Sequence, residues 1–376
     1  MTGTIAQQET DAPALEWLRG LDVALVHDYL NQRGGAERVV LELSDIWPTA
    51  PIYTSLYRPE STWPGFKLRD VRTTFLDRLP VDRGFRNLFP LYPAAFASFG
   101  EIKADVVIAS SSGWGHMAPV HPDAFHVVYC HTPARWLYRS EHLEGAKRSR
   151  RAALVRVAAP PLRALDRRAA HRADLYLANS RNVQERIRRL YGIEAEVLYP
   201  PVDTERFTPT PRGERLLVVS RLLPYKHVDL AIRVANRMGI GLDVVGDGPM
   251  MAELRELAGP TVTLHGAVDD DTVVELMQNC RAVCVLAEED FGIVAVEAQA
   301  AGKPVIAYAG GGALEVLTGS HAGALFRSRE ESDLMRAVRE SDTIDPDPRR
   351  LARTAARFSS DAFTLSLASL LQSYLT

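Results

Sequence analysis

The chain has only three cysteines among 376 residues and no long apolar run. Cys280 and Cys284 lie four residues apart, but no further Cys or His completes the spacing of a metal site. We interpret both as small buried side chains of a protein in a reducing compartment. No stretch reaches the roughly 18 apolar residues of a membrane-spanning helix. We therefore expect a cytoplasmic protein that is at most peripheral to a membrane.

Strong positive charge and a secretory signal are also missing. The net charge is -3, which argues against a general nucleic-acid-binding protein, so we expect no nucleic-acid partner. The first residues carry acids at Glu9, Asp11 and Glu16 and no apolar run, unlike a signal peptide. We expect residues 1–20 to form a poorly ordered leader.

Short apolar runs alternate with helical stretches along the rest of the chain, which is typical of parallel α/β sheets. The prolines Pro200, Pro201, Pro209 and Pro211 indicate a linker near the middle. Since the chain is long for one core, we predict two Rossmann-like α/β domains with a small-molecule site in the cleft between them. The expected strands are 21–28, 51–55, 105–110, 126–130, 174–179 and 196–199 in the first domain, and 216–220, 242–245, 262–265, 282–286, 305–308 and 324–326 in the second.

Two motifs in the first half follow predicted strands. Gly34-Gly35 precedes an apolar-periodic helix over 39–46. The G-x-G-x-x-G fingerprint is absent, so no dinucleotide is indicated, but adjacent glycines let a phosphate or a sugar approach the backbone. A tight turn alone is the alternative. His131 follows the strand 126–130, where it either contacts a ligand or holds the structure by hydrogen bonds.

Four features of the second half also fall where strands end. Arg221 and Lys226 supply a forked and a compact cation for phosphate oxygens. Glu289 and Glu297 stand eight residues apart across a strand-to-helix turn, placed to accept hydrogen bonds from sugar hydroxyls; two carboxylates that only favour a helix dipole are the alternative. The other two features are the glycine turns Gly246-Asp247-Gly248 and His265-Gly266-Ala267-Val268. Together they indicate a nucleotide-sugar site.

From Leu21 to its end, the chain resembles a retaining glycosyltransferase of the GT-B class, family 4 (group 1). The E-x7-E spacing of Glu289 and Glu297 is the most specific mark. The supporting marks are Gly34-Gly35, Asn179-Ser180, and Arg221 with Lys226. The resemblance implies a GT-B fold of two Rossmann-like domains facing across a cleft. Its parts would be the leader 1–20, an acceptor-side domain 21–200, a nucleotide-sugar-binding domain 201–358, and a C-terminal helix, 359–376, that packs back on the first domain.

The resemblance also implies a role for each matching residue. Among the catalytic residues, Arg221 and Lys226 would hold the donor diphosphate, Glu289 the hydroxyls of the donor sugar, and His131 its reacting face. Glu297 would bind the ribose. The other expected donor-binding residues are Gly34, Gly35, Gly246, Gly248, His265, Gly266, Val268, Asp290, Phe291, Gly292 and Ile293. No protein nucleophile is implied, because catalysis is by positioning and charge stabilisation. No metal or other cofactor is implied either, since two cations neutralise the diphosphate.

Three motifs depart from the family's common pattern. Where the family commonly has Lys-Gly, this chain has Lys226-His227, and where the family has Glu-Gly-Phe-Gly, this chain has Glu289-Asp290-Phe291-Gly292. The common Asn-Gly-Val-Asp is replaced by Pro-Pro-Val-Asp at 200–203. With His131-Thr132-Pro133 and Trp136-Leu137-Tyr138, these variants resemble a branch associated with mannose transfer in polysaccharide assembly. We therefore expect a hexosyltransferase that moves mannose from GDP-mannose to a glycan or a polyprenyl- or lipid-linked acceptor.

A basic segment runs from Lys147 to Arg172, with nine Lys or Arg and the single acid Asp166. It either binds an anionic membrane surface at the inner face of the cytoplasmic membrane or is a solvated helix face. The aromatic segment 85–99 belongs either to the hydrophobic core or to an apolar acceptor-side surface near that membrane. Two alternatives for the function stay open: transfer to a small soluble acceptor, and a non-catalytic sugar-nucleotide-binding scaffold.

Overall fold

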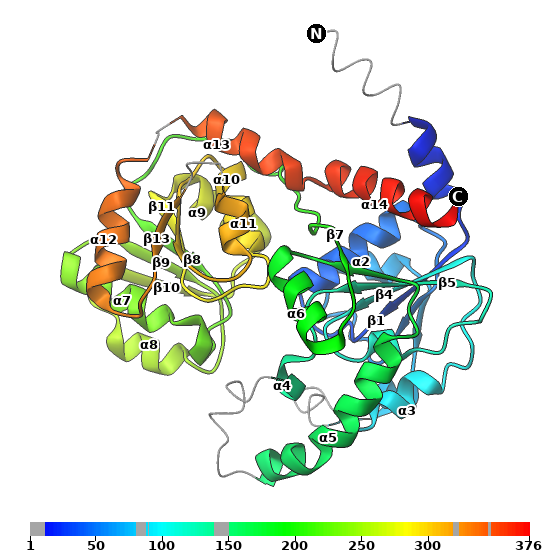
Figure 1. The fold of residues 1–376 in the computed structure, drawn as a ribbon. Coiled ribbons are helices and arrows are strands. Elements are labelled where there is room, and N and C mark those ends of the chain that lie inside the picture. Colours follow the sequence, from blue (N-terminus) through cyan, green and yellow to red (C-terminus); the bar gives the residue numbers. More distant parts are fainter. Residues whose placement is uncertain (1–11, 80–87, 89, 139–149, 319–322, 345–346) are drawn as a thin grey trace. The chain divides into compact units, whose positions relative to one another are not determined.

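A computed structural model of the protein describes residues 12–79, 88, 90–138, 150–318, 323–344 and 347–376. By its internal contacts the chain divides into two compact units (Figure 1). The N-terminal unit comprises residues 1–199 and 363–376, and the C-terminal unit residues 200–362. Each is built on one parallel sheet, and each is described by itself below.

The N-terminal unit has a seven-stranded sheet in the order β3-β2-β1-β4-β5-β6-β7. From β1 the chain adds β2 and β3 on one side and then crosses over to place β4 on the other side of β1, so the direction in which strands are added reverses there. Ligands of open α/β sheets bind at such a reversal, outside the carboxyl ends of the strands. The strands are β1 (Val23–His27), β2 (Ile52–Thr54), β3 (Val71–Thr73), β4 (Val106–Ser111), β5 (Phe125–Cys130), β6 (Leu175–Ala178) and β7 (Glu196–Val197).

Helices α2 (Gly35–Ile46), α3 (Tyr92–Ala97), α4 (Arg135–Tyr138), α5 (Arg150–Ala170) and α6 (Arg181–Tyr191) join these strands, with the short 3-10 helices η1 (Pro64–Leu68), η2 (Phe75–Arg78) and η4 (Gly115–Met117). Every residue of β1 and β4 is buried. A parallel strand that helices cover on both faces needs such a continuous apolar run.

The C-terminal unit has a six-stranded sheet in the order β10-β9-β8-β11-β12-β13, with the reversal at β8. Its strands are β8 (Leu216–Val219), β9 (Leu242–Val245), β10 (Val262–Gly266), β11 (Ala282–Val285), β12 (Val305–Tyr308) and β13 (Gly323–Phe326). Its helices are η6 (Pro224–Lys226), α7 (Val228–Met238), α8 (Met251–Leu257), α9 (Asp270–Asn279), α10 (Ile293–Ala300), α11 (Ala313–Leu317), α12 (Glu331–Ser341), α13 (Pro348–Ala355) and η7 (Ala356–Phe358).

The predicted strands are all present, with ends that differ by up to two residues. The structure adds β3, whose sequence Val71-Arg72-Thr73 contains no apolar run. Part of the expected leader is also ordered: residues 12–19 form a helix. Leu18 is completely buried, and the indole nitrogen of Trp47 donates to its carbonyl at 2.8 Å. Packing against the core therefore orders this stretch, whereas residues 1–11 lie outside the described residues.

The aromatic segment 85–99 belongs to the core in its described part. Tyr92, Ala95 and Phe96 of α3 are buried in one cluster of the N-terminal unit. Residues 80–87 and 89 lie outside the description. Within the residues that the structure describes, no helix has the length and apolar character needed to cross a membrane.

The last helix, α14 (Ser360–Leu375), carries the chain into the core of the N-terminal unit. Phe363, Leu367, Ala368 and Leu371 are buried there, and the rings of Phe363 and Tyr129 meet edge to face at 6.1 Å. Because these residues follow a helical spacing, one stripe of α14 supplies all four contacts. A segment from the far end of the chain thus completes the hydrophobic core of the N-terminal unit.

Replacing Leu371 by alanine tests this contribution to the core. The side chain is 0% exposed, so its loss should leave a cavity and lower the free energy of unfolding by about 2–5 kcal/mol. Urea unfolding of the full chain, followed by circular dichroism, measures the change. The matched control is Gln372→Ala, an exposed neighbour, with an expected effect within about 0.5 kcal/mol. If Leu371→Ala unfolds like the control, α14 does not stabilise the unit.

Candidate functional site

Lys226 and Glu289 meet in the C-terminal unit although 63 residues separate them. The Lys226 ammonium donates to Oε1 of Glu289 at 2.6 Å. Lys226 ends η6, just after β8, and Glu289 follows β11, the neighbouring strand. Their side chains keep 15% and 25% of their surface exposed. The pair is therefore an accessible cation and carboxylate at the carboxyl edge of the sheet.

Glycines fix the backbone around Glu289. Its carbonyl accepts from the amide of Gly312 at 2.8 Å, and Glu289 forms an isolated parallel bridge with Gly311. Gly311 has φ 72°, and a Cβ there would overlap the Glu289 carbonyl oxygen. Gly292, with φ 103°, is the N-cap of α10, which begins at Ile293. The carboxylate is thus held by a loop that tolerates no side chain at Gly311.

The rest of the two-glutamate segment leads into α10. Phe291 is buried, and its ring packs against that of Phe358 at 5.2 Å. Asp290 is partly exposed beside it. Glu297 lies just over one turn into the helix and is partly exposed. The start of α10, at Gly292 and Ile293, presents the positive end of a helix dipole, where an anion is favoured.

The Arg221 side chain is exposed just after β8. Its loop packs closely against the glycine turn after β9: Leu222 donates to the carbonyl of Asp247 at 2.9 Å. A Cβ on Gly246 would overlap the carbonyl of Ser220, and one on Gly248 that of Leu222. We expected these glycines to admit a ligand. The structure supplies a packing reason for both, since they let the two loops touch.

The His265 side chain turns to the protein. Its Nε2 lies 2.9 Å from Oδ1 of Asp243. The other oxygen of that carboxylate, Oδ2, accepts from Nε of Arg215 at 2.7 Å. Burial favours the neutral acid, but the hydrogen bonds from Arg215 and His265 hold the pKa of Asp243 below its usual value. The parts of this turn that are accessible to a ligand are the partly exposed backbone at Gly266, where φ is 74°, and the partly exposed Val268.

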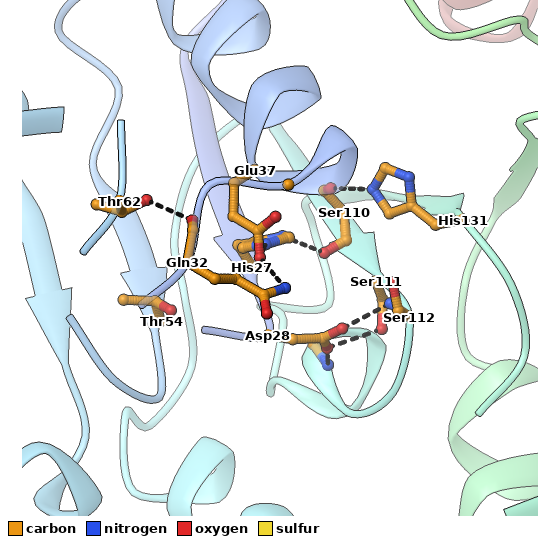
Figure 2. A network of polar contacts seen from close by, with 12 residues as sticks. His27, Asp28, Gln32, Glu37, Thr54, Thr62, Ser110, Ser111, Ser112 and His131 are labelled. Carbon is orange, nitrogen blue, oxygen red and sulfur yellow. Dashed lines mark hydrogen bonds and ion pairs between the residues drawn. The ribbon is translucent and has the colours of Figure 1, made fainter. Parts of the chain in front are cut away.

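In the N-terminal unit, His131 belongs to a buried polar network at the ends of β1, β4 and β5 (Figure 2). Its Nε2 is hydrogen-bonded to Oγ of Ser110 at 2.8 Å, and His131 is 8% exposed. His27, opposite Ser110 in the sheet, donates from Nδ1 to the Ser110 carbonyl at 2.9 Å. Ser110 thus links the two imidazoles, and the orientation of His131 is set by its neighbour on β4.

A carboxylate lies under the Gly34-Gly35 turn. Glu37 is 1% exposed; its Oε1 accepts from Gln32 at 2.9 Å and lies 3.9 Å from Nε2 of His27 (Figure 2). A Cβ on Gly34 would overlap the other carboxylate oxygen. Burial opposes the charge on His27, yet the hydrogen bond and charge of Glu37 raise its pKa above the usual value. The glycine turn therefore lies directly over the His27–Glu37 pair.

Asp28 organises the loop after β4. Its carboxylate accepts from the amides of Ser112, Trp114 and Gly115 at 2.6, 2.9 and 2.6 Å, and from Oγ of Ser111 at 3.0 Å. It is 3% exposed. Sequence reasoning missed Asp28, His27 and Glu37. The available signal was that each is a charged or titratable residue at the boundary of an apolar run.

The predicted site residues thus fall in both units. Gly34, Gly35 and His131 belong to the N-terminal unit, and the remaining ones belong to the C-terminal unit. Within the C-terminal unit, Lys226 and Glu289 are in contact. Among the residues that the structure describes, no three or more His, Cys, Asp or Glu side chains are grouped so that they could hold a metal ion.

Comparisons with curated proteins find mycobacterial relatives. The GDP-mannose-dependent alpha-(1-6)-phosphatidylinositol monomannoside mannosyltransferase of Mycobacterium tuberculosis is 33% identical over 52% of this chain and 59% of its own length. The D-inositol 3-phosphate glycosyltransferase of Mycolicibacterium smegmatis is 27% identical over 57% of this chain and 56% of its own. The chain thus matches little more than half the length of these relatives.

Solved structures show the fold. HepE of Anabaena, in complex with UDP and glucose, superposes with a TM-score of 0.70 at 20% identity, covering 94% of this chain and 100% of that one. WaaG, a glycosyltransferase involved in lipopolysaccharide biosynthesis, gives a TM-score of 0.64 at 18% identity, over 93% and 99%. The expected GT-B class, with two Rossmann-like α/β domains, is confirmed.

Two family profiles match adjoining parts of the sequence. The profile described as Glycosyltransferase Family 4 matches residues 33–206. The profile described as Glycosyl transferases group 1 matches residues 203–358. Because the two matches together span nearly the whole chain, the protein belongs to the family 4, group 1 glycosyltransferases.

Proposed function

We propose that the protein is a retaining glycosyltransferase that moves mannose from GDP-mannose to a glycan or lipid-linked acceptor in cell-surface polysaccharide or glycolipid assembly. The observation that carries this proposal is the Lys226–Glu289 pair at the adjoining ends of β8 and β11. A cation for phosphate and a carboxylate for hydroxyls lie within hydrogen-bond distance of each other. A nucleotide sugar carries both groups close together, so one donor molecule engages both.

The proposed chemistry rests on charge. As the bond between sugar and phosphate breaks, the leaving diphosphate gains negative charge, and a fixed ammonium stabilises it. Lys226 supplies that ammonium, and the exposed Arg221 adds a guanidinium that forks onto phosphate oxygens. The two side chains take the part that a metal ion plays elsewhere. Glu289 already accepts a hydrogen bond from Lys226 and orients the sugar as an acceptor of its hydroxyls, not as a nucleophile.

Relatives support the donor and leave a second candidate for the acceptor. The Mycobacterium tuberculosis relative is named for GDP-mannose and a phosphatidylinositol mannoside, which supports mannose transfer to a lipid. The Mycolicibacterium smegmatis relative is named for D-inositol 3-phosphate, which supports a small soluble acceptor. A non-catalytic scaffold is the third reading, and turnover of the donor distinguishes it from both.

Replacing Lys226 by alanine tests the proposed function. Loss of one preorganised cation should slow donor turnover at least about a hundredfold, measured as release of nucleoside diphosphate. A thermal-shift panel of GDP-mannose, UDP-glucose and ADP-glucose should show the largest stabilisation of the wild type by GDP-mannose. Lys67→Ala, a surface lysine that pairs with Glu60, is the control. Near-normal turnover of Lys226→Ala would remove the phosphate role.

Alanine at Gly311 tests whether the loop must hold Glu289 where it lies. The variant adds a methyl group that overlaps the Glu289 carbonyl, so we expect turnover to fall at least about tenfold, since small displacements of positioning groups cost rate. Gly239→Ala is the matched control: its φ is also positive, at 66°, but nothing lies within 4 Å of the added Cβ. Both lose stability, about 1 kcal/mol for the control. Equal turnover of the two variants contradicts the positioning role.

Helix α5 supports a membrane-facing surface. Arg163, Arg167 and Arg168 are exposed on it, as is 43% of Leu165. The acid of this segment, Asp166, is completely buried, where it accepts from the Tyr138 hydroxyl at 2.7 Å. The acid therefore does not neutralise the outer surface. Residues 147–149 of the basic segment lie outside the described residues. We infer that α5 binds an anionic membrane surface, which would bring the enzyme to a lipid-linked acceptor.

Reversing two of these charges tests the membrane proposal. In Arg167→Glu with Arg168→Glu, sedimentation with vesicles of phosphatidylglycerol and phosphatidylcholine should weaken at least tenfold, since each basic residue near such a surface contributes about 1 kcal/mol. The control reverses Arg349 and Arg353, two exposed arginines of α13. If both double variants lose vesicle binding equally, net charge alone explains the binding. If neither loses it, α5 does not bind the membrane.

A further inference from the structure

His227 has a backbone conformation that a side chain disfavours. Its φ is 53°, and among the described residues other than glycine it alone has a positive φ. It stands between η6 and α7, directly after Lys226. Glycine adopts this left-handed region at no cost, whereas a residue with a Cβ is strained in it. Such an outlier points to a function when nothing else in the fold explains it.

No described hydrogen bond to the His227 side chain compensates for this backbone strain. As N-cap of α7 it makes no side-chain capping hydrogen bond. Its described hydrogen bonds are those of the backbone, to Pro224 and from Leu230. Glycine at this position would keep both of them. The imidazole is therefore retained in a strained place without a hydrogen-bond partner among the residues that the structure describes.

The surroundings of the imidazole are cationic. Asp229 and Arg233 act on it from α7, and Arg329 from the loop before α12, which lies beside α7 (Figure 1). Arg233 bonds to Asp229 at 2.8 Å, so that carboxylate is already neutralised. Arg329 lies 3.7 Å over the ring of Tyr308. Burial first, and then the charge of Arg329, lower the pKa of His227, so the imidazole is mostly neutral at pH 7.

The same groups place His227 near the donor-binding edge. Arg329 donates to the carbonyl of Leu286, three residues before Glu289 in the same loop. Glu289 in turn accepts from Lys226, the neighbour of His227. Glu331, which starts α12, is paired with Arg237 at 3.2 Å and with Arg233 at 3.3 Å, and the charge of Glu288 acts on Arg329. Among the charges that act on the imidazole, that of Arg329 is still the largest. Because His227 directly follows Lys226 in the chain, its imidazole N–H is a candidate second donor for an anion that Lys226 binds.

We propose that His227 is a donor-binding residue whose imidazole donates a hydrogen bond to the diphosphate of the nucleotide sugar, beside Lys226. The inference rests on the proposed function and names a contact within that site. A bound phosphate brings negative charge close to the ring and favours the imidazolium. Binding then takes up a proton, so affinity for the diphosphate rises as the pH falls toward the lowered pKa of the unbound imidazole.

The test is calorimetric titration of the full chain with GDP and with UDP between pH 5.5 and 8. His227→Gly should bind at least about tenfold more weakly, the loss of one hydrogen bond to a charged group, while its melting temperature without ligand is unchanged or higher. His227→Asn is the matched control, because asparagine tolerates positive φ and its amide donates without titrating. It should recover part of the affinity and none of the proton uptake.

The phosphate also titrates near pH 6, so the readout is the difference between wild type and variant at each pH. His227→Gly that binds as tightly as the wild type throughout would overturn the inference and leave the proposed function standing. A wild type that binds neither nucleotide would overturn the proposed function, and this contact with it. A lower melting temperature for the glycine variant would give His227 a structural role instead.

Discussion

The covering of each parallel sheet on both faces is the constraint on which the rest of the structure depends. A strand buried on both sides favours apolar side chains, so polar side chains gather where the strands end. In the N-terminal unit, β1 and β4 are buried along their whole length, and His27, Asp28 and Ser110 stand at their carboxyl ends. In the C-terminal unit, Lys226 and Glu289 hold the same position relative to β8 and β11. The sheet therefore determines where chemistry occurs before any ligand is considered.

Polar groups gathered at such an edge are costly unless each has a partner. Asp28 meets the cost with four donors from the end of β4 and the loop after it. Glu37 meets it at one oxygen only, since its Oε1 faces Gln32 and His27 and its buried Oε2 has no hydrogen-bond partner among the described residues. Lys303, with no exposed surface, donates to the carbonyls of Thr210 and Pro211 and so ties the linker to the turn before β12. For Asp28 and Lys303, the hydrogen bonds that satisfy the buried charge also fix a backbone segment. The rigidity of the site thus follows from the satisfaction of its charges.

Sequence reasoning predicts what depends on local patterns. Apolar runs identify the strands, and strands in one parallel sheet imply that Lys226 and Glu289 share an edge, despite the 63 residues between them. It fails where tertiary contacts decide. The strand β3 has no apolar run, and residues 12–19 are helical because Leu18 reaches the core. The partnership of His27 with Glu37 needs a strand and a helix to be placed side by side, which no local pattern encodes.

The roles proposed for the residues that match the family pattern concern what nucleotide sugars share, namely a diphosphate and hydroxyl groups. They do not explain how one member selects one donor, since selectivity needs contacts that differ between members. The two departures nearest the Lys226–Glu289 pair both replace a glycine by a side chain that carries hydrogen-bonding groups, His227 and Asp290. At His227 the backbone still has the left-handed conformation that suits glycine. A fold that keeps a glycine conformation but carries an imidazole retains a cost in backbone strain, and the proposed hydrogen bond to the donor diphosphate is the contact that would offset it.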